Sequence, residues 1–168
     1  MRTDGKRGFV FVNHYQRLTE LADIENAVIS AENVEFPPID VKGEVSFFMP
    51  FNMKMGDSVL EYATAQPLCK CGETYFFAEI PNIKAEYKFS KGSANIVTVP
   101  FENAKYMRKL NGTVYIGGGC NLYEENGQIH SVEDGEYICQ KWNGSEFETV
   151  KIVQSAKQSN VEITGVEN

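Results

Sequence analysis

The run GFVFVN at residues 8–13 is densely β-branched and aromatic, and it follows the turn signal Asp4-Gly5. Short apolar runs bounded by turn-forming residues are typical of strands covered on both faces. We therefore predict a strand at the centre of a sheet. Its phenylalanines should point to one face and its valines to the other, with all four side chains buried. These residues are Phe9, Phe11, Val10 and Val12.

Similar short runs continue along the first hundred residues. Turn-forming pairs such as Pro37-Pro38, Lys42-Gly43 and Lys91-Gly92 separate them. The predicted strands lie at residues 27–30, 34–36, 44–48, 58–65, 74–80, 85–89 and 95–99. This spacing predicts a β meander with short loops.

Hairpin turn signals punctuate the second half of the chain. Asn-Gly and Asp-Gly pairs readily adopt the positive φ angles of two-residue hairpin turns. They occur at Asn111-Gly112, Asn126-Gly127, Asp134-Gly135 and Asn143-Gly144. Predicted strands follow at residues 113–116, 120–123, 128–132, 136–142 and 147–153. Residues 101–110 are the one candidate for a helical turn or two, and residues 154–160 are polar enough for a loop.

The overall composition also favours strands. Valine and isoleucine total 26 residues, whereas leucine and alanine total 16. We predict an all-β fold, either an antiparallel β-sandwich or a barrel-like domain of about a dozen short strands, with less than about 10% helix. Residues 1–168 should form a single domain, and a sub-boundary near residues 91–94 stays open.

Charge and hydropathy exclude several classes of partner. The chain has 16 basic and 23 acidic residues, a net charge of −7, and no basic cluster longer than two residues. This argues against nucleic acid and anionic membranes as partners. The apolar stretch Val45–Phe51 is far too short to cross a bilayer, and residues 1–6 are too polar for a signal peptide. We expect a cytoplasmic protein.

The cysteines and glycines do not indicate a metal or cofactor. Cys69 and Cys71 are one residue apart, whereas zinc sites usually need a longer spacer and a second Cys or His pair. We expect these two residues, Cys120 and Cys139 to be reduced thiols. The triple glycine at 117–119 lacks the Lys-Ser/Thr of a phosphate loop, so we interpret it as a wide turn or a bulge between strands.

No catalytic residue can be assigned from the side chains alone. His14, at the end of the first strand, could recognise a sugar hydroxyl; more simply, Tyr15 and Arg17 beside it hold the strand end through hydrogen bonds to nearby backbone. His130 should face solvent. A glycosidase needs two carboxyls about 5 to 9.5 Å apart. Acids in or beside strands are Glu61, Glu79, Glu86 and Glu102, but nothing in the sequence shows that two of them converge. Aromatic rings able to stack on sugars are expected to pack inside the sandwich instead. They are Trp142 and Tyr62, Tyr75, Tyr87, Tyr106, Tyr115, Tyr123 and Tyr137.

Residues 7–17, RGFVFVNHYQR, resemble the strand just after the catalytic barrel in family 35 glycoside hydrolases, the β-galactosidases. Further segments are similar to the same post-barrel β domain in order and spacing. They are PFN at 50–52, LEYATAQPL at 60–68, YFF at 75–77, and Glu86. The resemblance covers about residues 5 to 90. Beyond Lys91 it is limited to hairpins of the right size.

In that family the two catalytic glutamates lie on a (β/α)₈ barrel, and this chain has neither βαβ alternation nor enough residues to form one. The resemblance therefore implies a non-catalytic accessory domain whose partner is the catalytic barrel of a β-galactosidase-like parent. It also implies that Met1 is not the natural start, which would hide a signal peptide. An exposed packing face should give weak self-association.

Two other functions remain open at this point. A stand-alone carbohydrate-binding β-sandwich would need two or three aromatic faces exposed along one groove. An independent small hydrolase would need a pair of carboxyls in a cleft.

Overall fold

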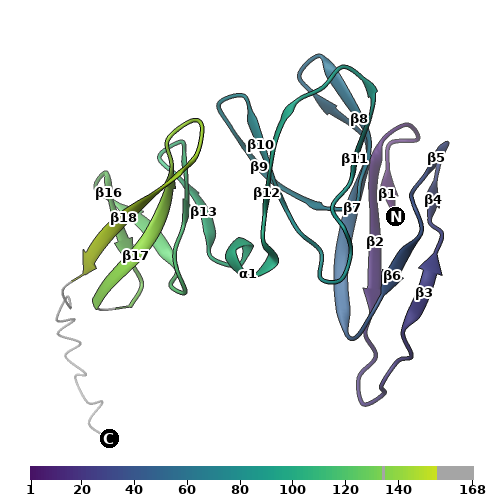
Figure 1. Cartoon of the computed structure of the whole chain (residues 1–168), viewed down its shortest axis with the longest axis horizontal. Coiled ribbons are helices and arrows are strands. Elements are labelled where there is room, and N and C mark those ends of the chain that lie inside the picture. Colours follow the sequence, from purple (N-terminus) through teal and green to yellow (C-terminus); the bar gives the residue numbers. More distant parts are fainter. Residues whose placement is uncertain (134, 155–168) are drawn as a thin grey trace, which may run out of the picture.

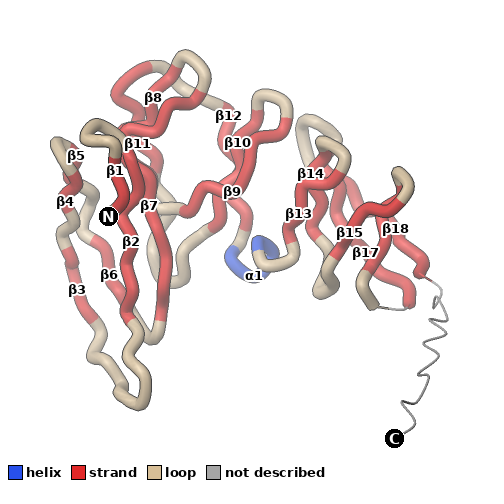
Figure 2. Tube along the Cα trace, turned by 180° about the vertical axis from the view of Figure 1, so that it is seen from behind, coloured by secondary structure: helices blue, strands red, loops and turns tan. Residues whose placement is uncertain are grey.

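The computed structural model describes residues 1–133 and 135–154. Strands account for 61% of the described residues and helix for 3%, which confirms the all-β prediction. The strands form successive layers along the long axis of the molecule, with the early strands at one end and β13 to β18 at the other (Figure 1). Figure 2 shows the same order from behind, with the short helix α1 (Phe101–Ala104) between the two ends.

A five-stranded antiparallel sheet dominates the first half of the chain. Its order is β1-β2-β7-β8-β11. The strands are β1 (Arg2–Thr3), β2 (Gly8–His14), β7 (Val45–Met55), β8 (Ser58–Ala63) and β11 (Tyr87–Lys91). Strands β2 and β7 pair without a register shift, from Gly8 opposite Phe51 to His14 opposite Val45. Strand β2 thus lies inside the sheet, although its outer neighbour is only two residues long.

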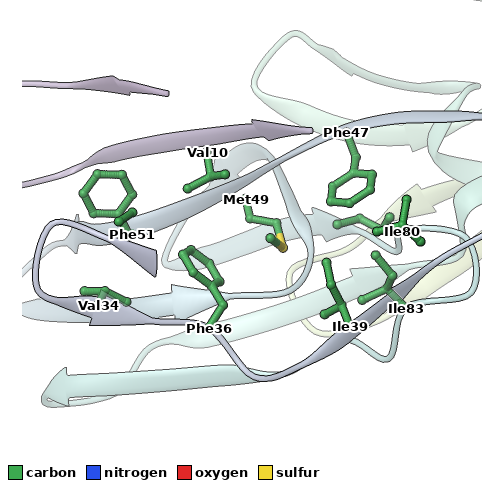
Figure 3. Close-up of a cluster of buried hydrophobic side chains, with 11 residues drawn as sticks. Val10, Val34, Phe36, Ile39, Phe47, Met49, Phe51, Ile80 and Ile83 are labelled. Atoms are coloured by element: carbon green, nitrogen blue, oxygen red, sulfur yellow. The ribbon is translucent and has the colours of Figure 1, made fainter. Parts of the chain in front are cut away.

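The segment between β2 and β7 folds back over one face of this sheet. It forms two small ribbons. They are β3 (Ile24–Ala27) with β6 (Ile39–Val41), and β4 (Ser30–Ala31) with β5 (Val34–Glu35). Figure 3 shows Phe36 and Ile39 of this layer pointing at Met49 and Phe47 of β7. The prediction of a simple meander is therefore wrong here, because this excursion supplies the apolar layer that the inner face of the sheet needs.

The prediction that strand β2 is buried on both faces is also wrong. Val10 points into the ribbon layer and is buried, whereas the side chain of Phe11 is 52% exposed and that of Phe9 is half-buried. The ribbons cover only the inner face, so the phenylalanines of β2 lie on the outer face. An all-apolar run does not show whether the same chain covers both of its faces.

A three-stranded sheet forms the middle layer, and its central strand is the one buried on both faces. The strands are β9 (Gln66–Cys71), β10 (Thr74–Ala78) and β12 (Asn95–Val99), in the order β12-β10-β9. Phe77 of β10 packs with Leu60 of the five-stranded sheet, and Phe76 packs with Val114 and Trp142 on the other side. Strands β10 and β12 are parallel, the exception among the antiparallel pairs of the described chain. Residues 91–94 lead from β11 to β12, and the sub-boundary there stays a prediction.

The second half of the chain follows its turn signals. It contains β13 (Met107–Leu110), β14 (Thr113–Ile116), β15 (Leu122–Glu125), β16 (Gln128–Ser131), β17 (Gly135–Trp142) and β18 (Phe147–Gln154). Asn111-Gly112 and Asn126-Gly127 both have positive φ angles and close two-residue hairpins, as predicted. The two-residue turn predicted at Asn143-Gly144 is wrong, because Trp142 pairs with Phe147 and four residues, 143–146, close the β17–β18 hairpin; of the pair, Gly144 alone has a positive φ angle. Asp134 lies outside the described residues. The helical turn expected in 101–110 is limited to α1, because residues 107–110 pair with β14.

Candidate functional site

Three phenylalanines, one exposed and two half-buried, form an aromatic face on the outer side of strands β2 and β7. Phe11 lies directly opposite Phe48, and their ring centroids are 5.8 Å apart with 31° between the planes. Phe9 contacts Phe48 edge-on, at 5.7 Å and 79°. The backbone N–H of Phe48 donates to the Gln66 side chain at 3.2 Å, which ties this part of β7 to the start of β9. We call Phe9, Phe11 and Phe48 the aromatic face.

A shallow groove of about 630 Å³ lies beside the aromatic face. Phe9 and Phe11 form its apolar side, together with Met53 of β7. The hairpin between β1 and β2 forms the opposite wall through Arg2, Thr3, Asp4 and Arg7, and Lys54 completes the rim. The groove therefore combines aromatic surface with several charges.

A hydrogen-bonded turn holds the hairpin wall in place. The carboxylate of Asp4 accepts hydrogen bonds from the backbone N–H groups of Lys6 and Arg7, both at 3.0 Å. It also accepts one from Arg7 Nε at 3.0 Å, and the Gly5 N–H donates to the Thr3 hydroxyl at 2.9 Å. The backbone N–H bonds are the main reason why the pKa of Asp4 is lowered. Asp4 is thus held as a carboxylate in this turn.

Gly8 allows β1 to approach β2. It pairs with Thr3, and a Cβ atom at this position would collide with the carbonyl oxygen of Arg2. Any side chain at residue 8 would therefore push β1 away from the sheet. The glycine of the RGF segment is thus required by the close approach that forms the groove wall.

The charges around the groove differ in sign from the protein as a whole. Arg2, Arg7 and Lys54 line it, against the single carboxylate of Asp4, while the chain carries a net charge of −7. The Arg7–Asp4 ion pair is exposed on both sides. Among the described residues, neither Arg2 nor Lys54 has an ion-pair or hydrogen-bond partner for its side chain, and both are exposed.

His14 holds a strand end and does not line the groove. It is 7% exposed. Its Nδ1 lies 2.7 Å from the Gly43 carbonyl oxygen and its Nε2 lies 3.1 Å from that of Ala22. These contacts join β2 to the loops on either side of the ribbon layer, so the strand end is held by hydrogen bonds of His14 itself and not by the predicted bonds from Tyr15 and Arg17. Tyr15 and Arg17 beside it are exposed.

Three of the four acidic residues considered in the sequence form ion pairs with lysines. Glu61 pairs with Lys88 at 2.8 Å, Glu86 with Lys84 at 3.0 Å, and Glu102 with Lys105 at 2.6 Å. Glu79 is exposed and lines a different depression from Glu86. The described residues contain no group of three or more His, Cys, Asp and Glu side chains able to hold a metal ion.

The four cysteines are free thiols in the structure, as expected. Cys120 and Cys139 are buried together, and burial raises the pKa of both thiols and of the half-buried Cys69. The Cys71 thiol donates to the Gly112 carbonyl oxygen at 3.1 Å.

The triple glycine lies close to β17. A Cβ at Gly118 would collide with the carbonyl oxygen of Ile138, so the backbones of the two segments lie too close for a side chain at this position.

The remaining aromatic candidates contribute to packing. Trp142 is buried against Phe76, with ring centroids 5.1 Å apart. The seven tyrosines other than Tyr15 are all half-buried. His130, expected to face solvent, is half-buried with its ring stacked on Tyr123 at 5.4 Å. Sequence reasoning missed the aromatic face because it treated Phe9 and Phe11 as core residues. The charged residues around the run were the available signal.

No helix in the described part of the chain is both long and apolar enough to span a bilayer. Comparisons with protein-family models, with curated proteins and with solved structures found no match to this chain.

Proposed function

We propose that this chain is a non-catalytic accessory β domain of a β-galactosidase-like glycoside hydrolase, and that its aromatic face packs against the catalytic (β/α)₈ barrel. The observation that carries the proposal is the exposed ring of Phe11, which packs on the half-buried Phe48 on the outer side of the five-stranded sheet. Apolar area left in water forgoes about 25 cal/mol per Å², so a ring cluster that its own chain covers only in part suits a surface that a partner covers.

The positions of the resembling segments also support the proposal. The segments at residues 7–17, 50–52 and 60–68 contain β2, part of β7 and most of β8, which are consecutive strands of one sheet. Gly8 pairs with Phe51, and Phe51 pairs in turn with Tyr62. Residues from all three segments thus form one row across the sheet. These three segments therefore meet in one sheet, while the YFF segment at 75–77 lies in β10 of the middle layer.

The second candidate is a stand-alone carbohydrate-binding module, which the groove beside the aromatic face favours. Sugar recognition uses a flat ring for stacking and several hydrogen-bonding side chains. The three rings are inclined to one another by 31° and 79°, and the one carboxylate in the groove is already bonded within its own turn. The geometry therefore suits apolar protein side chains better than a pyranose.

Mixing experiments test the accessory role. The partner is the isolated catalytic barrel of a family 35 β-galactosidase that carries the RGF-FVN-YQR pattern after its barrel. We expect the full chain and this barrel to form an equimolar complex in sedimentation velocity runs, and the chain alone to leave a chromogenic galactoside intact.

Two results would overturn the proposal. One is the absence of a complex together with binding of galacto-oligosaccharides, which would favour the carbohydrate-binding module. The other is hydrolysis by the chain alone that survives repurification and disappears in the Glu61→Gln/Glu79→Gln variant.

We also propose that the chain is cytoplasmic, which its free thiols support.

A further inference from the structure

The residues that line the groove beside the aromatic face indicate the charge of a surface that would bind there. It is bordered by three cationic side chains, Arg2, Arg7 and Lys54, and by one carboxylate, Asp4. Asp4 is engaged by Arg7 and by backbone N–H groups, which leaves Arg2 and Lys54 as exposed cations without a side-chain partner among the described residues. The local charge is therefore positive in a chain of net charge −7.

We infer that this groove recognises a protein segment in which an apolar side chain is flanked by carboxylates. The inference depends on the proposed function, because it specifies the chemistry of the surface that covers the aromatic face. The apolar side chain would lie against Phe11 and Met53, and the carboxylates would reach Arg2 and Lys54. Met53 suits such a contact because its unbranched thioether adapts to different shapes. Arginine favours carboxylates because its planar guanidinium binds them through two parallel hydrogen bonds.

The charge pattern argues against two copies meeting through the same groove. A symmetric dimer would place the cations of one copy against those of the other, and like charges in a contact are unfavourable. A separate partner that carries carboxylates would instead place opposite charges against Arg2 and Lys54, which is favourable. An acidic polysaccharide would satisfy the cations but not the inclined rings of Phe9 and Phe48, which do not form a flat platform.

Two labelled peptides test the inference on the full chain by fluorescence anisotropy. Each has the central sequence Leu-Phe-Leu, flanked on both sides by a pair of glutamates in one peptide and by a pair of lysines in the other. We expect the acidic peptide to bind about tenfold or more tightly than the basic peptide at low salt. This preference should shrink at about 0.5 M NaCl, because salt screens exposed charges.

Paired variants assign the binding to this groove. Lys54→Glu and Phe11→Ser should each lower the affinity of the chain for the acidic peptide by about tenfold. Lys91→Glu is the matched control for charge, since Lys91 is an exposed lysine at the far edge of the same sheet. Ile138→Ser is the matched control for exposed apolar surface, since Ile138 is 69% exposed on β17. Both control variants should bind as the original chain does.

Each alternative outcome contradicts the inference. These outcomes are equal binding of the two peptides, no binding of the acidic peptide, equal losses in test and control variants, or stronger binding of polygalacturonate than of the acidic peptide. A dimer that Lys54→Glu disrupts would show that a second copy is the occupant.

The barrel experiment separates this inference from the proposed function. A barrel complex that Lys54→Glu does not weaken would overturn the charge preference and leave the accessory role standing. Selective binding of the acidic peptide without any barrel complex would support the charge preference of the groove and overturn the accessory role.

Discussion

Phe11 of β2 and Phe48 of β7 lie directly opposite each other on the outer face of the five-stranded sheet, and the centroids of their rings are 5.8 Å apart. The next residue of β7 toward the chain start, Phe47, points to the other side and is buried against the ribbon layer. Neighbouring phenylalanines of one strand thus have opposite environments. One belongs to the core of this chain, and the other belongs to a surface that we propose a partner covers.

Two phenylalanine truncations should separate the core from the aromatic face. Phe51 is 0% exposed, so Phe51→Ala should cost about 3 to 5 kcal/mol by leaving a cavity. Phe11→Ala should cost no more than about 1 kcal/mol, because half of its side chain already contacts water. Urea unfolding of both variants measures the difference. Equal losses of stability would mean that the outer face is buried in solution.

Replacing Gly8 should detach the first strand. A Cβ at residue 8 collides with the Arg2 carbonyl oxygen, so Gly8→Ala should release β1 and open the hairpin. Limited trypsin digestion measures this, because cleavage after Lys6 and Arg7 should become faster. Asn13→Ala, an exposed substitution at the other end of β2, is the control and should leave cleavage unchanged. Unaltered cleavage in Gly8→Ala would contradict the close approach described here.

The hairpin turn should respond to acid at an unusually low pH. Asp4 has a pKa below its ordinary value of 3.8, because the Arg7 and Lys6 N–H groups bind its charged form. A lowered folded-state pKa stabilises the turn above the unfolded pKa, and this stabilisation is lost as pH falls through the folded pKa. NMR titration of the Lys6 and Arg7 amide protons should therefore show a midpoint below 3.8, absent in Asp4→Asn. A midpoint above 3.8 would show that these bonds do not form.

Thiol chemistry should distinguish buried from partly exposed cysteines. In a disulfide-exchange assay, each molecule of denatured protein should react through four thiols and release four equivalents of the reporter thiol, since the structure has four free cysteines. In the folded protein, Cys120 and Cys139 should react slowest, because burial raises the pKa of both and limits access. Cys120→Ser should remove one slow equivalent. Four equally fast thiols in the folded state would contradict the packing of the second half.

The sequence predicted those parts of the fold that local chemistry determines. Asn-Gly pairs favour positive φ angles, and at Asn111-Gly112 and Asn126-Gly127 they close two-residue hairpins, so these two turns could be placed in advance. Strand β9 was missed because it begins with Gln66-Pro67 and lies at a sheet edge, where a residue without an N–H is tolerated. The parallel pairing of β10 with β12 depends on packing between distant segments, which no local pattern encodes.

The candidate site was harder to predict for a related reason. An apolar run such as residues 8–13 has the same pattern whether its second face is covered by its own chain or by another domain. Only the path of residues 15–44, which cover the inner face alone, shows that Phe11 is left exposed. The roles of Arg2 and Gly8 depend on the short strand β1, which was too brief to recognise from its composition.

The central claim is that the aromatic face is the surface that binds the catalytic barrel. The most direct test is to measure the affinity of the isolated barrel for the chain, for Phe11→Ser and for Ile138→Ser by isothermal titration calorimetry. We predict that Phe11→Ser weakens binding by about tenfold or more, while Ile138→Ser binds as tightly as the original chain. Equal affinities for Phe11→Ser and the original chain would contradict the claim.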